Sequence, residues 1–193
     1  DLIRKDWLEE LTNLQDNLPA FSHEKALHII ESELGRPANE LFEDFPSAPI
    51  ASASLGQVYK AKLNKNYWVA VKVQRPQLIF NIRRDIVIIK TLCVFSAPIL
   101  PLNLGFGLGE IIDEFGRSLF DEVDYKKEAN NAEKFSNLFS KNKSVTIPKV
   151  EKHLSSKKVL TTSWIDGTKL KDRNELINNN LNPSQIIRTG VIS

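Results

Sequence analysis

Cysteine is almost absent from the sequence, because Cys93 is the only one among 193 residues. A lone cysteine cannot form an internal disulfide, and Cys93 lies in an apolar run, so we expect a core residue in a reducing compartment. An excess of one charge is also absent. The formal net charge is +2, and no basic stripe with interleaved aromatic residues occurs. The composition therefore predicts no nucleic-acid partner.

Long apolar runs are missing too. The longest apolar stretch, residues 86–102, is interrupted by Lys90, Pro98 and Pro101. A membrane-spanning helix needs roughly 20 apolar residues without such interruptions, so we interpret the stretch as a buried helix that ends before Pro98. Peripheral contact with a membrane is the weaker alternative. The hydrophobic fraction of 41% is that of an ordinary soluble globular protein.

The most informative motif is the pair A-S-A-S-L-G-Q-V-Y at 51–59 and W-V-A-V-K-V-Q at 68–74. The phosphate-covering loop of a protein kinase reads G-x-G-x-x-G-x-V and is followed one strand later by V-A-I-K. The four loop positions are occupied here by Ala51, Ala53, Gly56 and Val58, and the second motif ends at Lys72. The spacing predicts a kinase-like nucleotide site in which two of three glycines are alanine.

The strand around Lys72 supports the same interpretation. Valines alternate with Ala70 and Lys72, which is typical of a half-buried strand. We expect an adenine ring to lie over Ala70 and the Lys72 ammonium to reach the α- and β-phosphates. Residues 57–63 predict a second strand, and 64–66 predict the hairpin turn between the two. The alternative is a small-residue loop beside a solvated lysine on an edge strand.

The remaining pattern predicts mostly helices. One is expected after Asp6 with a stripe of apolar residues to Leu18, and one after Ser22 that ends at Gly35. The other expected elements are helices near 39–42, after Pro76, over 110–139 and from Pro183, and strands at 145–151 and 159–165.

The long helix places a carboxylate on an apolar face. At helical spacing Glu122 shares a side with Ile111 and Phe115. Such a carboxylate is costly unless a cation meets it. Because a kinase pairs its strand lysine with a helix glutamate, we predict an ion pair between Glu122 and Lys72. The second choice of partner is Glu128, and the alternative is that Glu122 is a surface carboxylate.

The segment V-L-T-T-S-W-I at 159–165 is followed by Asp166 and Gly167. An apolar strand that runs into a turn is typical of the hinge between the two lobes of a kinase. We therefore expect the backbone groups of Ser163 to Ile165 to bond the adenine edge, although many buried strands also end in Asp-Gly.

Together these residues resemble the UbiB/ADCK family of atypical kinase-like proteins, named for ubiquinone biosynthesis. The resemblance covers most of the chain. It rests on L-T-N-L-Q-D-N-L-P at 11–19, E-L-G-R-P at 33–37, P-I-A-S-A-S-L-G-Q-V-Y at 49–59, V-A-V-K-V-Q-R-P at 69–76 and E-V-D-Y-K-K-E-A-N-N-A-E-K-F at 122–135. Ser52 departs from the pattern, because the family usually has alanine there.

The resemblance implies an α+β fold, namely a kinase-like N-lobe with an alanine-rich nucleotide loop and inserted helices. We expect a helical N-terminal extension at 1–45 packed over the cleft, the N-lobe at 46–165, and the hinge exit and start of a mostly missing C-lobe at 166–193. By resemblance, Ser54 would bond phosphate, Lys72 would hold phosphates and Glu122 would orient Lys72. Asp124 would face the extension. The hinge would consist of Thr162, Ser163, Trp164 and Ile165.

The resemblance also implies ATP and magnesium as cofactors, and an ATPase or small-molecule kinase that supports prenylquinone synthesis of the ubiquinone or plastoquinone type. Its expected partners are prenylquinone precursors or quinone-biosynthesis proteins. The expected location is the cytoplasm or membrane periphery of a bacterium, or a plastid or mitochondrion. The alternative is a non-catalytic nucleotide-sensing or lipid-chaperoning module.

The catalytic motifs H-x-D-x-x-x-x-N and D-F-G do not occur, and the chain begins with Asp1 rather than methionine. We therefore expect part of a longer protein whose catalytic aspartate and metal-binding asparagine and aspartate follow residue 193. Within the chain we expect neither catalytic residues nor a metal site, and the downstream sequence would distinguish enzyme from binding module.

Overall fold

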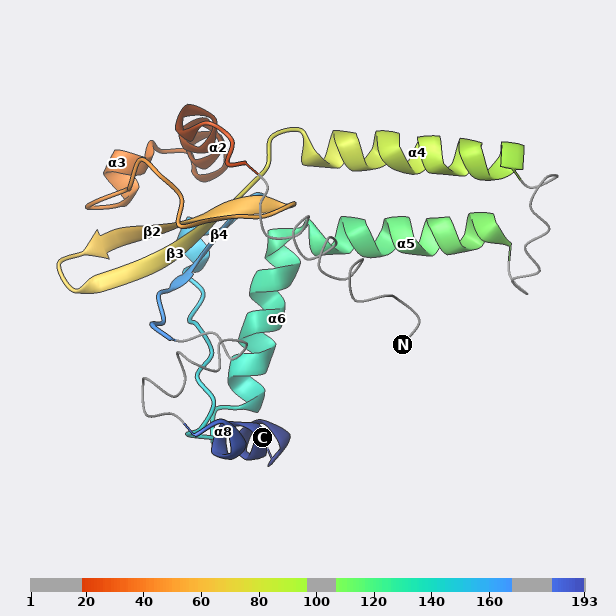
Figure 1. Cartoon of the computed structure of the whole chain (residues 1–193). Coiled ribbons are helices and arrows are strands. Elements are labelled where there is room, and N and C mark those ends of the chain that lie inside the picture. Colours follow the sequence, from red (N-terminus) through yellow and green to blue (C-terminus); the bar gives the residue numbers. More distant parts are fainter. Residues whose placement is uncertain (1–18, 97–106, 168–181, 193) are drawn as a thin grey trace.

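The computed structural model describes residues 19–96, 107–167 and 182–192. Its centre is an antiparallel sheet with the order β1-β2-β3-β4 (Figure 1). The strands are β1 (Ala51–Ser52), β2 (Gly56–Asn64), β3 (Tyr67–Gln74) and β4 (Val159–Ser163). The expected hairpin of β2 and β3 is confirmed, with its turn at residues 65–66.

One face of the sheet forms the main core. Val69, Val71 and Val73 of β3 are fully buried on this face, as the alternation predicted. The helices α2 (His23–Leu34) and α3 (Ala38–Leu41) cover it (Figure 1). Both helices confirm the predictions made for these segments. The helix expected after Asp6 lies outside the described residues.

The chain leaves the sheet after β3 and forms a pair of helices that extends away from the sheet (Figure 1). We call this pair the helical hairpin. It consists of α4 (Leu78–Ser96) and α5 (Leu108–Glu122), which lie side by side. Ile86 of α4 packs onto Gly116 of α5. A Cβ added to Gly116 would lie 3.0 Å from the Cδ1 atom of Ile86. Lys90 forms an ion pair with Asp113 across the two helices.

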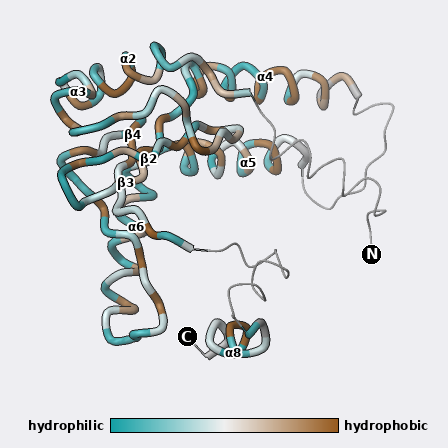
Figure 2. Tube along the Cα trace, turned by 60° about the vertical axis from the view of Figure 1, so that its left-hand side comes forward, coloured by the Kyte–Doolittle hydropathy of each residue, from teal (hydrophilic) through white to brown (hydrophobic). Residues whose placement is uncertain are grey.

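Hydrophobic residues recur along α4 and α5 (Figure 2), and many of them are exposed, so the expectation of a buried helix before Pro98 is wrong. The large exposed ones are Phe80, Val87, Ile88, Ile89, Leu92 and Phe95 on α4 and Ile111 and Phe115 on α5. Within the described ranges, no helix combines the length and the apolar character that crossing a bilayer requires.

The prediction of one helix over 110–139 is wrong, because the chain turns after Glu122. A second helix, α6 (Tyr125–Leu138), runs in a different direction from α5 (Figure 1). Asp124 caps it, since its carboxylate accepts the N–H of Lys126 at 3.0 Å. The carbonyl of Val123 accepts a hydrogen bond from the buried Gln74 amide at 2.7 Å, so a contact with β3 fixes the break.

The strand predicted at 145–151 is also wrong. Only Val150 pairs, in an isolated bridge to Thr162, and the short 3-10 helix η1 (Lys152–Leu154) follows. Pro148 has no N–H to donate to a ladder, which disfavours a longer strand. The helix expected from Pro183 is confirmed as α8 (Pro183–Ile192).

Gly35 ends α2, and replacing it tests whether its left-handed backbone conformation stabilises the protein. Its φ of +76° lies in the left-handed region, and its N–H donates to the Glu31 carbonyl at 2.8 Å. Gly35→Ala should lower the free energy of unfolding by about 1 kcal/mol, because a Cβ disfavours this conformation. Gly109→Ala is the control, because no atom lies within 4 Å of a Cβ there. Urea midpoints should fall for the first variant and not for the second.

Candidate functional site

The face of the sheet opposite the main core carries several of the residues predicted to hold a nucleotide. We call it the α6 face, because Lys72 contacts α6 there. The register places Ala51 opposite Val58, and Val58 opposite Lys72, in one row across three strands. In the neighbouring row Ala70 lies opposite Thr162. Residues directly opposite each other share a face, so these five predicted residues are brought together.

Lys72 has a carboxylate partner, but it is not the one predicted first. Its Nζ atom lies 2.7 Å and 3.0 Å from the two carboxylate oxygens of Glu128 in α6. Glu122 is the exposed last residue of α5. The predicted pair of Lys72 and Glu122 is therefore wrong, because the helix break changes the direction of the chain between the two glutamates. The second choice, Glu128, is confirmed.

Tyr125 lies beneath the loop and Lys72, and no role was predicted for it. It is the fully buried first residue of α6, and the Lys72 ammonium lies 4.7 Å from the centre of its ring. A Cβ added to Gly56 would lie 2.7 Å from the Tyr125 hydroxyl and 2.4 Å from the Val73 carbonyl oxygen. The absence of a Cβ at Gly56 therefore leaves room for the Tyr125 hydroxyl and the Val73 carbonyl.

The alanine-rich loop does not need the backbone freedom of glycine. Among the described residues, positive φ occurs only at Gly35 and Gln77, so residues 51–56 all keep ordinary backbone angles. The N–H of Ala53 donates to the Gly56 carbonyl at 2.8 Å, which closes the turn. Ser54 is exposed at its tip. Alanine is compatible with this conformation, and only Gly56 is required, for space rather than for φ.

The hinge prediction is narrowed by the hydrogen bonds around the end of β4. The N–H of Ser163 donates to the Lys149 carbonyl at 2.8 Å, and the N–H of Trp164 donates to the Trp68 carbonyl at 2.9 Å. Of the three predicted hinge donors, only the N–H of Ile165 has no hydrogen-bond partner within the described ranges. Ile165 is accordingly the one whose donor could bond a ligand.

Lys60 is a second basic residue beside the hinge that sequence reasoning missed. Its Nζ atom lies 4.5 Å from the Trp164 ring centre and 3.6 Å from a carboxylate oxygen of Asp166. The indole N–H of Trp164 bonds to Asp166, and this bond, together with the Lys60 charge, lowers the pKa of the carboxyl. The alternation of β2 could have revealed Lys60, because it is two residues from Val58 and on the same face.

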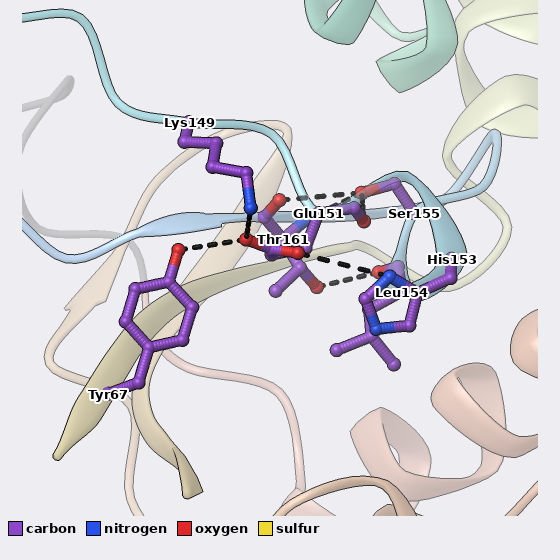
Figure 3. Close-up of polar contacts among 7 residues, drawn as sticks. All are labelled: Tyr67, Lys149, Glu151, His153, Leu154, Ser155 and Thr161. Atoms are coloured by element: carbon purple, nitrogen blue, oxygen red, sulfur yellow. Dashed lines mark hydrogen bonds and ion pairs between the residues drawn. The ribbon is translucent and has the colours of Figure 1, made fainter.

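A polar cluster stabilises the segment that pairs with the hinge strand (Figure 3). The buried Glu151 carboxylate accepts the Tyr67 hydroxyl at 2.8 Å and the Lys149 ammonium at 3.0 Å. Burial alone would raise the pKa of Glu151, but the hydrogen bonds from Lys149 and Tyr67 outweigh it and lower the pKa. The Thr161 hydroxyl donates to the Leu154 carbonyl at 2.6 Å (Figure 3).

The cluster predicts a pH-dependent stability. Because the pKa of Glu151 is lowered in the folded state, its ionised form stabilises the fold above the ordinary carboxyl range, and this contribution disappears as the pH falls through the lowered pKa. Tyr67→Phe should cost roughly 1–2 kcal/mol of unfolding free energy near neutral pH and much less in acid. Denaturant titrations of the unmodified protein and of Tyr67→Phe, from neutral to acidic pH, would measure this difference in unfolding free energy. A difference that persists in acid would contradict the prediction.

The Tyr125 hydroxyl is buried and has no hydrogen-bond partner among the residues that the structure describes. Burial, and then the Glu128 charge, raise the pKa of this tyrosine, so it stays neutral. An unsatisfied buried hydroxyl destabilises a protein, so Tyr125→Phe should raise the free energy of unfolding by about 1 kcal/mol. Tyr59→Phe is the matched control, because that hydroxyl accepts a bond from Gln57. A loss of stability in Tyr125→Phe would show that the hydroxyl has a partner.

Comparisons with known proteins agree with this geometry. The chain matches the ABC1 atypical kinase-like domain over residues 13–193. It is 45% identical over its full length to an uncharacterized protein of Synechocystis, covering 34% of that protein. It is 44% identical to the chloroplastic ACTIVITY OF BC1 COMPLEX KINASE 1 of Arabidopsis thaliana, covering 89% of this chain and 25% of that protein.

A solved structure has the same fold. Rv3197 of Mycobacterium tuberculosis, in complex with erythromycin, superposes with a TM-score of 0.64 at 30% identity, covering 86% of this chain and 41% of that one. The chain thus spans about a quarter to a third of the length of the two curated relatives. A family match over nearly all of the chain confirms the resemblance that the loop, lysine strand and Glu-x-Asp segment indicated, and the chain belongs to the ABC1 atypical kinase-like family.

Proposed function

We propose that this chain is the ATP-binding part of an atypical kinase or ATPase. The observation that carries the proposal is the ion pair of Lys72 and Glu128 on the α6 face, next to the alanine-rich loop. A lysine held by a helix carboxylate is the arrangement with which kinases position nucleotide phosphates. The kinase-like family of the chain supports the reaction class.

Each group has a definite task in this proposal. Lys72 supplies a point charge to the phosphates, and Glu128 keeps that charge over the α6 face. Ala70 and Val58 give a flat apolar surface for the adenine ring, and the N–H of Ile165 bonds its edge. Ser54 at the loop tip donates to a phosphate oxygen.

Magnesium accompanies ATP in the proposal because the family resemblance implies it. The described residues contain no group of three or more histidine, cysteine, aspartate or glutamate side chains able to hold a metal ion, so no step here is assigned to the metal. When bound, the ion would neutralise phosphate charge.

The biological role that we propose is support of prenylquinone synthesis, with contact at the periphery of a membrane. The family resemblance supports the role. The chloroplastic relatives of Arabidopsis and the Synechocystis relative favour a plastid or bacterial setting. Prenylquinone precursors and the enzymes that process them are the proposed partners.

Nucleotide titration of the complete protein tests the proposal. Lys72→Ala should weaken ATP binding roughly ten-fold or more, because a charge-assisted contact to phosphate is lost. Glu128→Gln should have a smaller effect in the same direction. Lys62→Ala is the matched control, since Lys62 also lies on the hairpin but pairs with Glu43. Absence of ATP binding by the unmodified protein would overturn the proposal, and binding without any turnover would favour the non-catalytic module.

A further inference from the structure

Arg75 connects the alanine-rich loop with the chain that precedes α2. It follows β3 directly, and its Nε donates to the Ala53 carbonyl at 2.9 Å. Its Nη2 donates to the Ser52 hydroxyl at 3.2 Å and to the Pro19 carbonyl at 3.0 Å. Its backbone N–H donates to the Leu55 carbonyl at 2.9 Å. One residue therefore bonds the loop at three places and the N-terminal segment at a fourth.

Residues 19–21, which we call the strap, are held by a second side chain. The Gln57 amide accepts the N–H of Phe21 at 3.1 Å and donates to the carbonyl of the same residue at 3.4 Å. Gln57 is fully buried, so losing its amide would leave backbone groups of Phe21 unpaired. The Phe21 ring also lies 5.9 Å from the Arg75 guanidinium carbon. The strap is thus bonded directly to Gln57 after the loop turn, and through Arg75 to Ser52 and Ala53 before it.

The contacts of Arg75 fix the direction of two peptide groups. The peptide bonds are trans, so a C=O and the following N–H point in opposite directions. The Ala53 and Leu55 carbonyls point at Arg75. The N–H groups of Ser54 and Gly56 therefore point away from it. Oriented backbone N–H groups in a turn form a binding site for anions.

The charge of Arg75 supports the same role. All its hydrogen bonds go to neutral acceptors, and within the described ranges it forms no ion pair with a carboxylate. Among those residues, no carboxylate neutralises its positive charge beside the loop. Anionic phosphate groups are attracted by such a charge, whereas an uncharged nucleoside is not.

We propose that Arg75 is a positioning residue for the phosphates of the nucleotide, and that the strap holds the loop in the conformation that binds them. This inference rests on the proposed ATP binding. The loop of this chain is accordingly oriented before the nucleotide arrives, by Arg75 directly after β3 and by the N-terminal strap that Arg75 and Gln57 hold.

The first test compares ATP with adenosine in titrations of the complete protein. Arg75→Gln should weaken ATP binding about ten-fold, because the loop N–H groups lose their orientation. It should leave adenosine binding within about two-fold, since Arg75 touches neither Ala70 nor the hinge. Arg84→Gln is the matched control, because that arginine pairs with its neighbour Asp85 on α4. Unchanged ATP affinity in Arg75→Gln, or an equal loss for both ligands, would overturn the inference.

The second test follows amide hydrogen exchange without nucleotide. Arg75→Gln and Gln57→Leu should each accelerate exchange in both the strap and residues 51–56, and Arg84→Gln should not. If the unmodified protein binds neither ligand, the proposed function fails, and this experiment still decides the coupling. If exchange stays slow in both segments, or rises equally throughout the sheet, the proposal that the strap orders the loop is contradicted.

Discussion

The contact between Tyr125 and Gly56 is the constraint on which the rest of the site depends. The Tyr125 hydroxyl lies where a Cβ of residue 56 would clash, and the ring of the same tyrosine lies beneath the Lys72 ammonium. Because Tyr125 is the first residue of α6, this contact fixes where the helix begins beneath the sheet. Glu128 lies three residues further along, which brings its carboxylate to Lys72. A larger residue at position 56 would therefore disturb the loop, the lysine and the helix together.

Much of the sheet could be predicted from the sequence, because the signals are local. Alternating valines in β3 identified the buried face, and the loop spacing assigned Val58 and Lys72 to one predicted nucleotide site, in which the structure pairs them. Gly35 with Pro37 beyond it marked the end of α2. These features depend on neighbouring residues in the chain, so they needed no knowledge of the tertiary structure.

The errors arose where a distant contact decides the local structure. Residues 110–139 have a helical pattern throughout, but the Val123 carbonyl bonds to Gln74, which is 49 residues away. The prediction assumed that one helix continues past this point. Because the helix ends there, Glu122 does not face Lys72 and was the wrong partner. The roles of Gln57 and Arg75 were invisible for a related reason, because both act on residues more than 20 positions away.

The backbone angles of the loop explain why alanine can replace glycine at positions 51 and 53. Glycine in a kinase loop gives freedom to close over a nucleotide, and that freedom has an entropic cost on binding. Residues 51–56 use no positive φ, so alanine at 51 and 53 removes conformations that this loop does not occupy. The alanines and the contacts of Arg75 act in the same direction, because both reduce the number of loop conformations before binding. Under the proposed ATP binding, a loop ordered in this way would favour one phosphate geometry and would have less capacity to close differently over different acceptors.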